Sequence, residues 1–171
     1  DVGLHEKLRD IFVISPEGIE NKSRRKGIAE AALFYVNAGA KTIHRIEIEE
    51  DSGVGFDQKT LVGVGLTNPK SLAADLKYNK IYWTDMLEGV VKRCRLAGCD
   101  GSKAEQVVSE AVKPTVMRLD TESGTGRRMI YWSDQKSLEG TEDYTLMRQP
   151  MDDPDASPQL VQDVAGHVRG M

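Results

Sequence analysis

The sequence predicts an all-β fold of the β-propeller class, because a short aromatic motif recurs along it at a nearly constant spacing. The pentapeptide IYWTD at residues 81–85 returns as IYWSD at residues 130–134, 49 residues later. A weaker copy, LFYVN, occupies residues 33–37 and begins 48 residues before the first. A repeat of this length is typical of propeller blades, each of which is a small antiparallel sheet of four strands.

Segments around the motif recur as well and supply the other strands of each repeat. Upstream, a short apolar run ends in aspartate, at Asp75 in one repeat and at Asp120 in the next. Downstream, apolar and polar residues alternate with a period of two, as in a strand with one buried face. The downstream segments are residues 42–48, 90–96 and 146–151, and they carry Arg45, Arg93 and Arg148 at the same place. Each repeat therefore reads as four short strands.

The expected organisation is a single domain, residues 1–171, with three blades at residues 24–68, 69–112 and 113–165. An ordinary β-sandwich with a chance repeat of Tyr-Trp is the alternative, and the matching order of several strands favours the propeller. The N-terminal repeat is the least regular. Its residues 27–35 fit two strands, one long strand or a short helix, since alanine favours helix. The register with the later copies favours a strand.

The second repeat resembles a whole repeat of the YWTD-type β-propeller of the low-density lipoprotein receptor group. The matching segments are Leu-Ala-Ala-Asp at residues 72–75, Asn-Lys-Ile-Tyr-Trp-Thr-Asp at 79–85, Val-Lys-Arg at 91–93 and Gly-Ser at 101–102. The third repeat matches more loosely. The first departs from the pattern, because Val36 and Asn37 replace Thr-Asp. The resemblance extends over residues 24–165.

This resemblance implies a six-bladed ring in which the signature residues are structural. The aromatic side chains are expected to pack between blades, and the aspartate to accept hydrogen bonds that tie neighbouring blades together. Such roles agree with the large apolar area of Tyr and Trp and with the need of a buried carboxylate for hydrogen-bond donors. The signature residues are Asp75, Tyr82, Trp83, Asp85, Asp120, Tyr131, Trp132 and Asp134.

By itself the chain is too short for such a ring. Six blades of this repeat need roughly 290 residues, whereas the chain has 171. An incomplete ring leaves blade faces and strand edges open, which favours association. We therefore expect a homodimer that closes the ring or completion of the ring by further chain, with capping by non-repeat structure as the remaining alternative.

Composition argues against several classes of partner. The net charge is −4, so nucleic acid, which binds to a basic face, is not an expected partner. No apolar stretch approaches the length of about 18 residues that a membrane-spanning helix needs. Cys94 and Cys99 fit either a local disulfide or two thiols. The compartment therefore stays open between the cytoplasm and the extracellular location that the resemblance implies.

The sequence contains no established catalytic motif. Its histidines, His5, His44 and His167, are too far apart for the spacing of a zinc site. A Gly-x-Ser-x-Gly nucleophile motif does not occur. The glycine-rich segments lack the spacing of a phosphate-binding loop. We expect neither a metal nor a cofactor.

Propellers place function in the loops at the ends of the central channel. We therefore expect a binding or scaffold module that presents loops to a protein or a small ligand. The alternative is a propeller enzyme of hydrolase, lyase or cyclase type, with carboxylate, Asn or His side chains converging at the channel mouth.

Two sets of residues are candidates for the site. The side chains proposed for ligand binding are Glu30, Asn37, His44, Arg45, Arg93 and Arg148. The three arginines among them fit a repeated contact between blades, or a surface contact, more readily than a ring around a ligand. The loops that depart from the repeat are residues 21–26, 49–58, 122–128 and 135–143. The last two are insertions relative to the second repeat, and insertions on one face often mark the binding face of a repeat protein.

Overall fold

The computed structural model describes residues 8–14, 31–48, 54–96, 99, 101–122, 127–136 and 143–165. These parts of the chain form twelve β-strands and no helix. The strands assemble into three four-stranded sheets, in each of which the strands lie side by side in chain order. All the strand pairs described are antiparallel. Three such sheets match the predicted blades.

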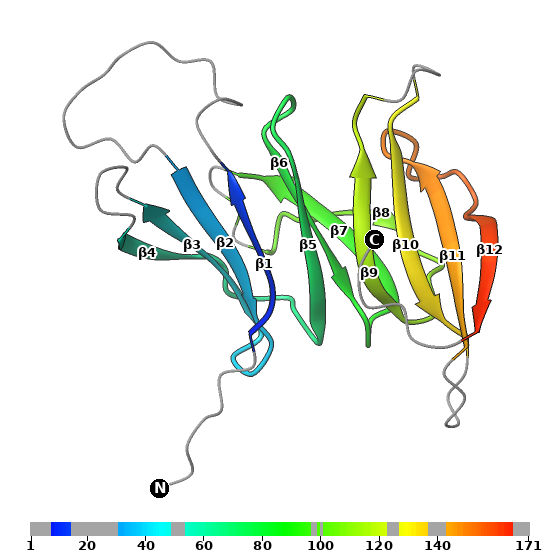
Figure 1. Cartoon of the computed structure of the whole chain (residues 1–171), viewed down its shortest axis with the longest axis horizontal. Helices are drawn as coiled ribbons and strands as arrows, with labels where there is room; N and C mark the ends of the chain where they lie inside the picture. The colour runs from blue at the N-terminus through cyan, green and yellow to red at the C-terminus, as the bar shows by residue number, and fades with distance from the viewer. Residues whose placement is uncertain are drawn as a thin grey trace, which may run out of the picture.

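The blades follow one another along the chain. Blade 1 contains β1 Leu8–Ile14, β2 Ala31–Asn37, β3 Thr42–Ile48 and β4 Gly55–Val62. Blade 2 contains β5 Pro69–Asp75, β6 Lys80–Asp85, β7 Val90–Arg95 and β8 Glu105–Val108. Blade 3 contains β9 Pro114–Asp120, β10 Met129–Gln135, β11 Asp143–Pro150 and β12 Gln159–Ala165. Figure 1 shows the blades in a row, and strand β5 of the middle blade contacts both β1 and β9.

Blade 1 starts earlier than the sequence suggested. Its first strand is β1, which pairs with β2 and lies upstream of the expected boundary at residue 24. From Ala31 onward the ambiguous N-terminal segment is strand β2, so the helix alternative is wrong for that part. Residues 24–30 lie outside the described parts of the chain.

The second strand of blade 2, β6, lies between two cores. Ile81 and Trp83 belong to a hydrophobic cluster with Phe34 of blade 1, whereas Tyr82 belongs to a cluster with Trp132 of blade 3. Successive side chains of a strand point to opposite faces, so one short apolar run supplies both clusters. We call the contact between blades 1 and 2 the first seam and the contact between blades 2 and 3 the second seam.

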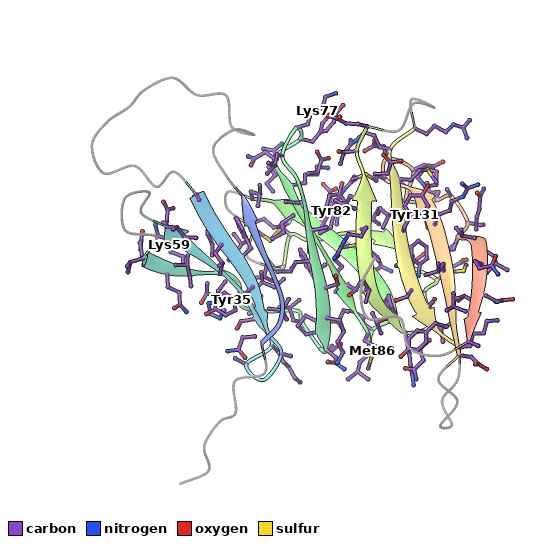
Figure 2. The ribbon with its side chains drawn as sticks, viewed as in Figure 1. Tyr35, Lys59, Lys77, Tyr82, Met86 and Tyr131 are labelled. Carbon is purple, nitrogen blue, oxygen red and sulfur yellow. A yellow bond between two sulfur atoms is a disulfide. The ribbon has the colours of Figure 1, made fainter. Side chains whose placement is uncertain are left out.

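The antiparallel strands bring their turns to two opposite ends of the molecule. Lys77 in the β5–β6 turn and Met86 after β6 mark these ends in Figure 2, and we call them the upper rim and the lower rim. At the lower rim Gly89 has a φ of 70°, and a Cβ atom there would lie 2.5 Å from the Ala111 carbonyl oxygen. Glycine is therefore required where the segment between blades 2 and 3 crosses the β6–β7 turn.

A disulfide joins Cys94 in β7 to Cys99, with a Cα–Cα distance of 5.7 Å. Of the two alternatives that the sequence left open, the structure has the disulfide. Both cysteines belong to the buried cluster of the first seam. The bridge therefore holds the segment that follows β7 at the hydrophobic core between blades 1 and 2.

Removing this bridge, in a Cys94→Ala/Cys99→Ala variant, is expected to lower the free energy of unfolding by about 2 kcal/mol, because a short covalent loop is opened. Urea denaturation followed by tryptophan fluorescence measures the loss. Dithiothreitol is the matched control, since it should destabilise the native chain to a similar extent and leave the variant unchanged. An equal effect of the reductant on both proteins would contradict this assignment.

Candidate functional site

The aspartate at the end of β6 holds the segment that connects blade 1 to blade 2. Asp85 accepts hydrogen bonds from the backbone N–H groups of Thr67 at 2.6 Å and Asn68 at 2.9 Å, and from the Thr67 hydroxyl. The Asp85 side chain is fully buried. A carboxylate tolerates such burial when several donors satisfy it. The connecting segment is thereby fastened to the strand at the centre of the next blade.

Blade 3 repeats this arrangement. Asp134, at the corresponding place in β10, accepts hydrogen bonds from the backbone N–H groups of Val112 at 2.8 Å and Lys113 at 2.5 Å. Blade 1 has Asn37 at this place, and its side-chain oxygen accepts a hydrogen bond from Ala40 N–H in the following turn at 2.9 Å. The interaction of Asn37 therefore lies within its own hairpin.

The two tryptophans act through packing. Trp83 and Trp132 are fully buried, one in each seam. Within the described residues neither indole nitrogen has a hydrogen-bond partner. Their contribution is therefore the burial of large rings between blades, and it does not include a hydrogen bond from the indole N–H group to another described residue.

An Asp85→Ala variant is expected to lower the free energy of unfolding by about 3 kcal/mol or more, because two buried N–H groups lose a charged acceptor. Asp153→Ala is the matched control, since Asp153 is exposed in the β11–β12 turn and a change within about 0.5 kcal/mol is expected there. Chemical denaturation of both variants measures the difference. Equal losses would show that Asp85 does not hold the connecting segment.

At the upper rim, Arg93 of blade 2 reaches across the second seam. Its Nη1 atom donates to the Met151 carbonyl oxygen of blade 3 at 2.7 Å, and its Nε atom donates to Glu105 at 2.7 Å. The same guanidinium lies 5.9 Å from the centre of the Tyr82 ring and 3.4 Å from its hydroxyl. Arg93 therefore links β7 and β8 of one blade to the end of β11 in the next.

Arg128 makes the reciprocal contact from blade 3 to blade 2. It pairs with Asp75, which is 1% exposed and ends β5, and with Asp152 at 3.0 Å. Its guanidinium carbon lies 4.0 Å from the centre of the Tyr78 ring in the β5–β6 turn. We call the group Asp75, Tyr78, Tyr82, Arg93, Glu105, Arg128 and Asp152 the rim cluster.

Burial and mutual contacts shift the pKa values of three of these groups. Burial works to lower the pKa of Arg93, but its hydrogen bonds to Glu105 and Tyr82 outweigh it and raise the pKa. Burial raises the pKa of Tyr82 in spite of the Arg93 cation beside it. The hydrogen bond from Arg93 lowers the pKa of Glu105. At neutral pH the rim cluster thus holds a fixed cation between a neutral phenol and a carboxylate.

The Glu105–Arg93 pair makes stability depend on pH. Since the folded carboxyl has the lower pKa, its contribution is complete above the ordinary glutamate value of 4.5 and is lost as the pH falls through the folded value. The Glu105 side chain is 60% exposed, and exposed ion pairs contribute little. We expect Glu105→Gln to cost less than about 1 kcal/mol at pH 7, and the cost to vanish well below pH 4.5.

Thermal unfolding of native and variant chains between pH 3 and pH 7 (roughly the range over which glutamate titrates) measures this difference. Glu110→Gln is the control, because Glu110 is an exposed carboxylate outside the rim cluster. A difference for Glu105→Gln that stays constant over the whole range would contradict the assigned pKa shift.

The structure does not gather the ligand-binding candidates of the sequence into one site. Arg93 belongs to the rim cluster, but Arg45 pairs with Glu47 of its own strand at 2.8 Å. Arg148 donates to Gln159 of β12 at 3.2 Å. Asn37 and His44 make local contacts within blade 1, and Glu30 lies outside the described residues.

His44 is held within the face of blade 1 that points away from blade 2. Its ring stacks on Tyr35 with 4.9 Å between centres, and its Nε2 atom lies 2.7 Å from the Thr42 hydroxyl. Of the candidate loops, residues 21–26 lie outside the described parts of the chain, whereas residues 54–58, 122, 127–128, 135–136 and 143 are described, and residues 55–58 form part of β4. Within the described residues no group of His, Cys, Asp or Glu is arranged to hold a metal ion. No helix in these parts is long and apolar enough to cross a membrane.

Sequence reasoning missed most of the rim cluster. Tyr78, Glu105 and Arg128 do not belong to the repeated motif. The contact of Tyr78 with Arg128 joins two blades, whereas Glu105 contacts Arg93 within blade 2. One signal was present, because Arg128 ends the loop at residues 122–128 whose length departs from the repeat.

The described geometry defines a protein of the β-propeller class, and the predicted fold class is confirmed by its likeness to solved propellers. A structure described as the nidogen/laminin complex matches 92% of this chain with a TM-score of 0.63 and 14% identity, over 49% of its own chain. A puromycin hydrolase S511A mutant complexed with PGG matches 95% of this chain with a TM-score of 0.62 and 12% identity, over 25% of its own chain.

The present chain thus spans about half the length of the first of these chains and a quarter of the second. At such low identity the likeness establishes the fold alone. No family model matches the chain.

Proposed function

We propose that the chain is part of a YWTD-type β-propeller that binds a protein partner at the upper rim of its second seam. The YWTD assignment is supported by the two aromatic motifs and by the matching hydrogen bonds of Asp85 and Asp134 to the preceding connecting segments. The likeness to a structure described as the nidogen/laminin complex supports protein binding as the kind of function.

The observation that carries this proposal is the setting of Tyr78. Its side chain is 50% exposed at the rim, while the Arg128 guanidinium against its ring is held by two carboxylates. A rigid aromatic residue with a polar end is the kind of group that dominates the energy of protein interfaces. Asp152 and Glu105, which are 59% and 60% exposed, belong to the same rim cluster, and the Lys77 ammonium lies 5.9 Å from the centre of the Tyr78 ring. A partner surface with an apolar centre and charges of both signs around it fits this arrangement.

The disulfide supports an oxidising compartment as the place where the protein folds, because such bridges are rare in reducing cytoplasm. A completed ring is also part of the proposal. Its missing blades come from a second copy or from further chain, since blades 1 and 3 each have a neighbour on one face only within the described chain.

A propeller enzyme is the alternative, and the likeness to a puromycin hydrolase structure is the observation in its favour. That likeness covers a quarter of the hydrolase chain. The polar candidates of blade 1 are engaged in local contacts: Asn37 with Ala40 N–H and His44 with Tyr35 and Thr42. We favour binding because Tyr78 presents exposed area on a rigid support.

A photo-crosslinking amino acid at position 78 tests the proposal. With the chain as bait in extracellular fluid, we expect an adduct from position 78 and none from position 160, where Leu160 of β12 is similarly exposed. The crosslinked protein is then identified and purified, and Tyr78→Ala is expected to weaken its binding at least about 10-fold, with Leu160→Ala as the unchanged control. Equal adducts at both positions, or equal affinities of both variants, would contradict rim binding.

A further inference from the structure

Three of the polar contacts that hold the second seam involve blade 2 residues whose counterparts recur in blade 3. Asp75 of blade 2 pairs with Arg128 of blade 3. Arg93 of blade 2 donates to the Met151 carbonyl oxygen of blade 3. The Thr84 hydroxyl of blade 2 donates to the Thr115 carbonyl oxygen of blade 3 at 3.0 Å. Asp75, Arg93 and Thr84 are therefore three polar side chains of blade 2 that bind the following blade.

Blade 3 offers the same set on the face that points away from blade 2. Strand register equates the Tyr131–Arg148 pair with the Tyr82–Arg93 pair, because both are direct cross-strand partners. Asp120 ends β9 as Asp75 ends β5. The corresponding residues on this face are Asp120, Tyr131, Ser133 and Arg148. We call them the outward set.

Three members of the outward set are more exposed than their counterparts in the seam, whereas Ser133 is as fully buried as Thr84. Asp75 is buried, whereas Asp120 is half-buried and accepts a hydrogen bond from Glu122 N–H at 3.3 Å. Tyr82 is fully buried, whereas Tyr131 is half-buried. Arg148, the counterpart of the partly buried Arg93, is exposed.

The two seams differ at the positions of Asp75 and Arg128. At the second seam the carboxylate Asp75 faces the cation Arg128. At the first seam Ile14 occupies the register position of Asp75, and Asn79 occupies the sequence position of Arg128. Carboxylate and cation are thus both present at one seam and both replaced at the other. A carboxylate at this position therefore indicates a cationic residue on the next blade.

We propose that the outward face of blade 3 binds a further propeller blade that carries arginine or lysine directly before its second strand, where it pairs with Asp120. The same blade presents a main-chain carbonyl group to Arg148 and an aromatic ring to Tyr131, as Met151 and Trp132 do at the second seam. This inference rests on the proposed completion of the ring and is independent of binding at the upper rim.

Blade 1 of a second copy lacks the required cation but provides a useful probe. Its residue at the position of Arg128 is Ala31, and its aromatic residue at the position of Trp132 is Tyr35. Ala31 and Tyr35 lie on the face of β2 opposite to Phe34, which packs on blade 2. An Ala31→Arg substitution therefore places a cation where Asp120 of another copy is expected to meet it.

Sedimentation equilibrium of the whole chain measures the outcome as a self-association constant. We expect Ala31→Arg to associate at least about 10-fold more tightly than Ala31→Gln, which adds length without charge. Adding Asp120→Asn to Ala31→Arg should remove the gain. Circular dichroism and thermal melting establish that the variants are folded. The exchanged pair Ala31→Asp with Asp120→Arg provides a second variant that should recover the gain.

Three outcomes would overturn the proposal. One is equal association of Ala31→Arg and Ala31→Gln with no recovery in the exchanged pair. Another is a gain that persists when Asp120 is replaced by asparagine. The third is a native chain that already forms a tight dimer insensitive to Asp120→Asn, because blade 1 would then bind without the cation. Tyr78→Ala should leave all these constants unchanged, which separates this test from that of rim binding.

Discussion

The structure depends on one interaction above the others, the hydrogen bonding of a buried aspartate to the backbone that enters its blade. A four-stranded sheet of this size cannot bury its faces alone, so each blade must be held at a fixed position against its neighbour. Asp85 and Asp134 do this by binding two successive N–H groups of the connecting segment. The packing of the tryptophan rings follows, because the connecting segment fixes the spacing between sheets.

The two seams use different physical means. The first is formed by aliphatic and aromatic side chains together with the buried disulfide. The second adds charged groups at its upper end, where Arg93 and Arg128 each bind across the interface. Removal of one partner of such a buried pair leaves an uncompensated charge, so the second seam tolerates fewer substitutions than the first.

The sequence alone predicted the class of fold and the residues at the centre of each blade, because both depend on a pattern that repeats within the chain. It did not predict the start of blade 1, since residues 15–30 separate β1 from β2 and break the period. It did not distinguish thiols from a disulfide, because the spacing of Cys94 and Cys99 permits both. It missed the part of the rim cluster formed by Arg128 and Tyr78, because these residues meet only through the packing of two blades.

The difference between the two faces of a blade gives the structure a polarity along the row of sheets. Two copies that met as successive blades do would place the outward face of blade 3 against the face of blade 1 that points away from blade 2. Such a contact joins two unlike surfaces and is therefore heterologous, head to tail. Such contacts produce a closed ring when the rotation between copies returns to the start, and an open filament when it does not.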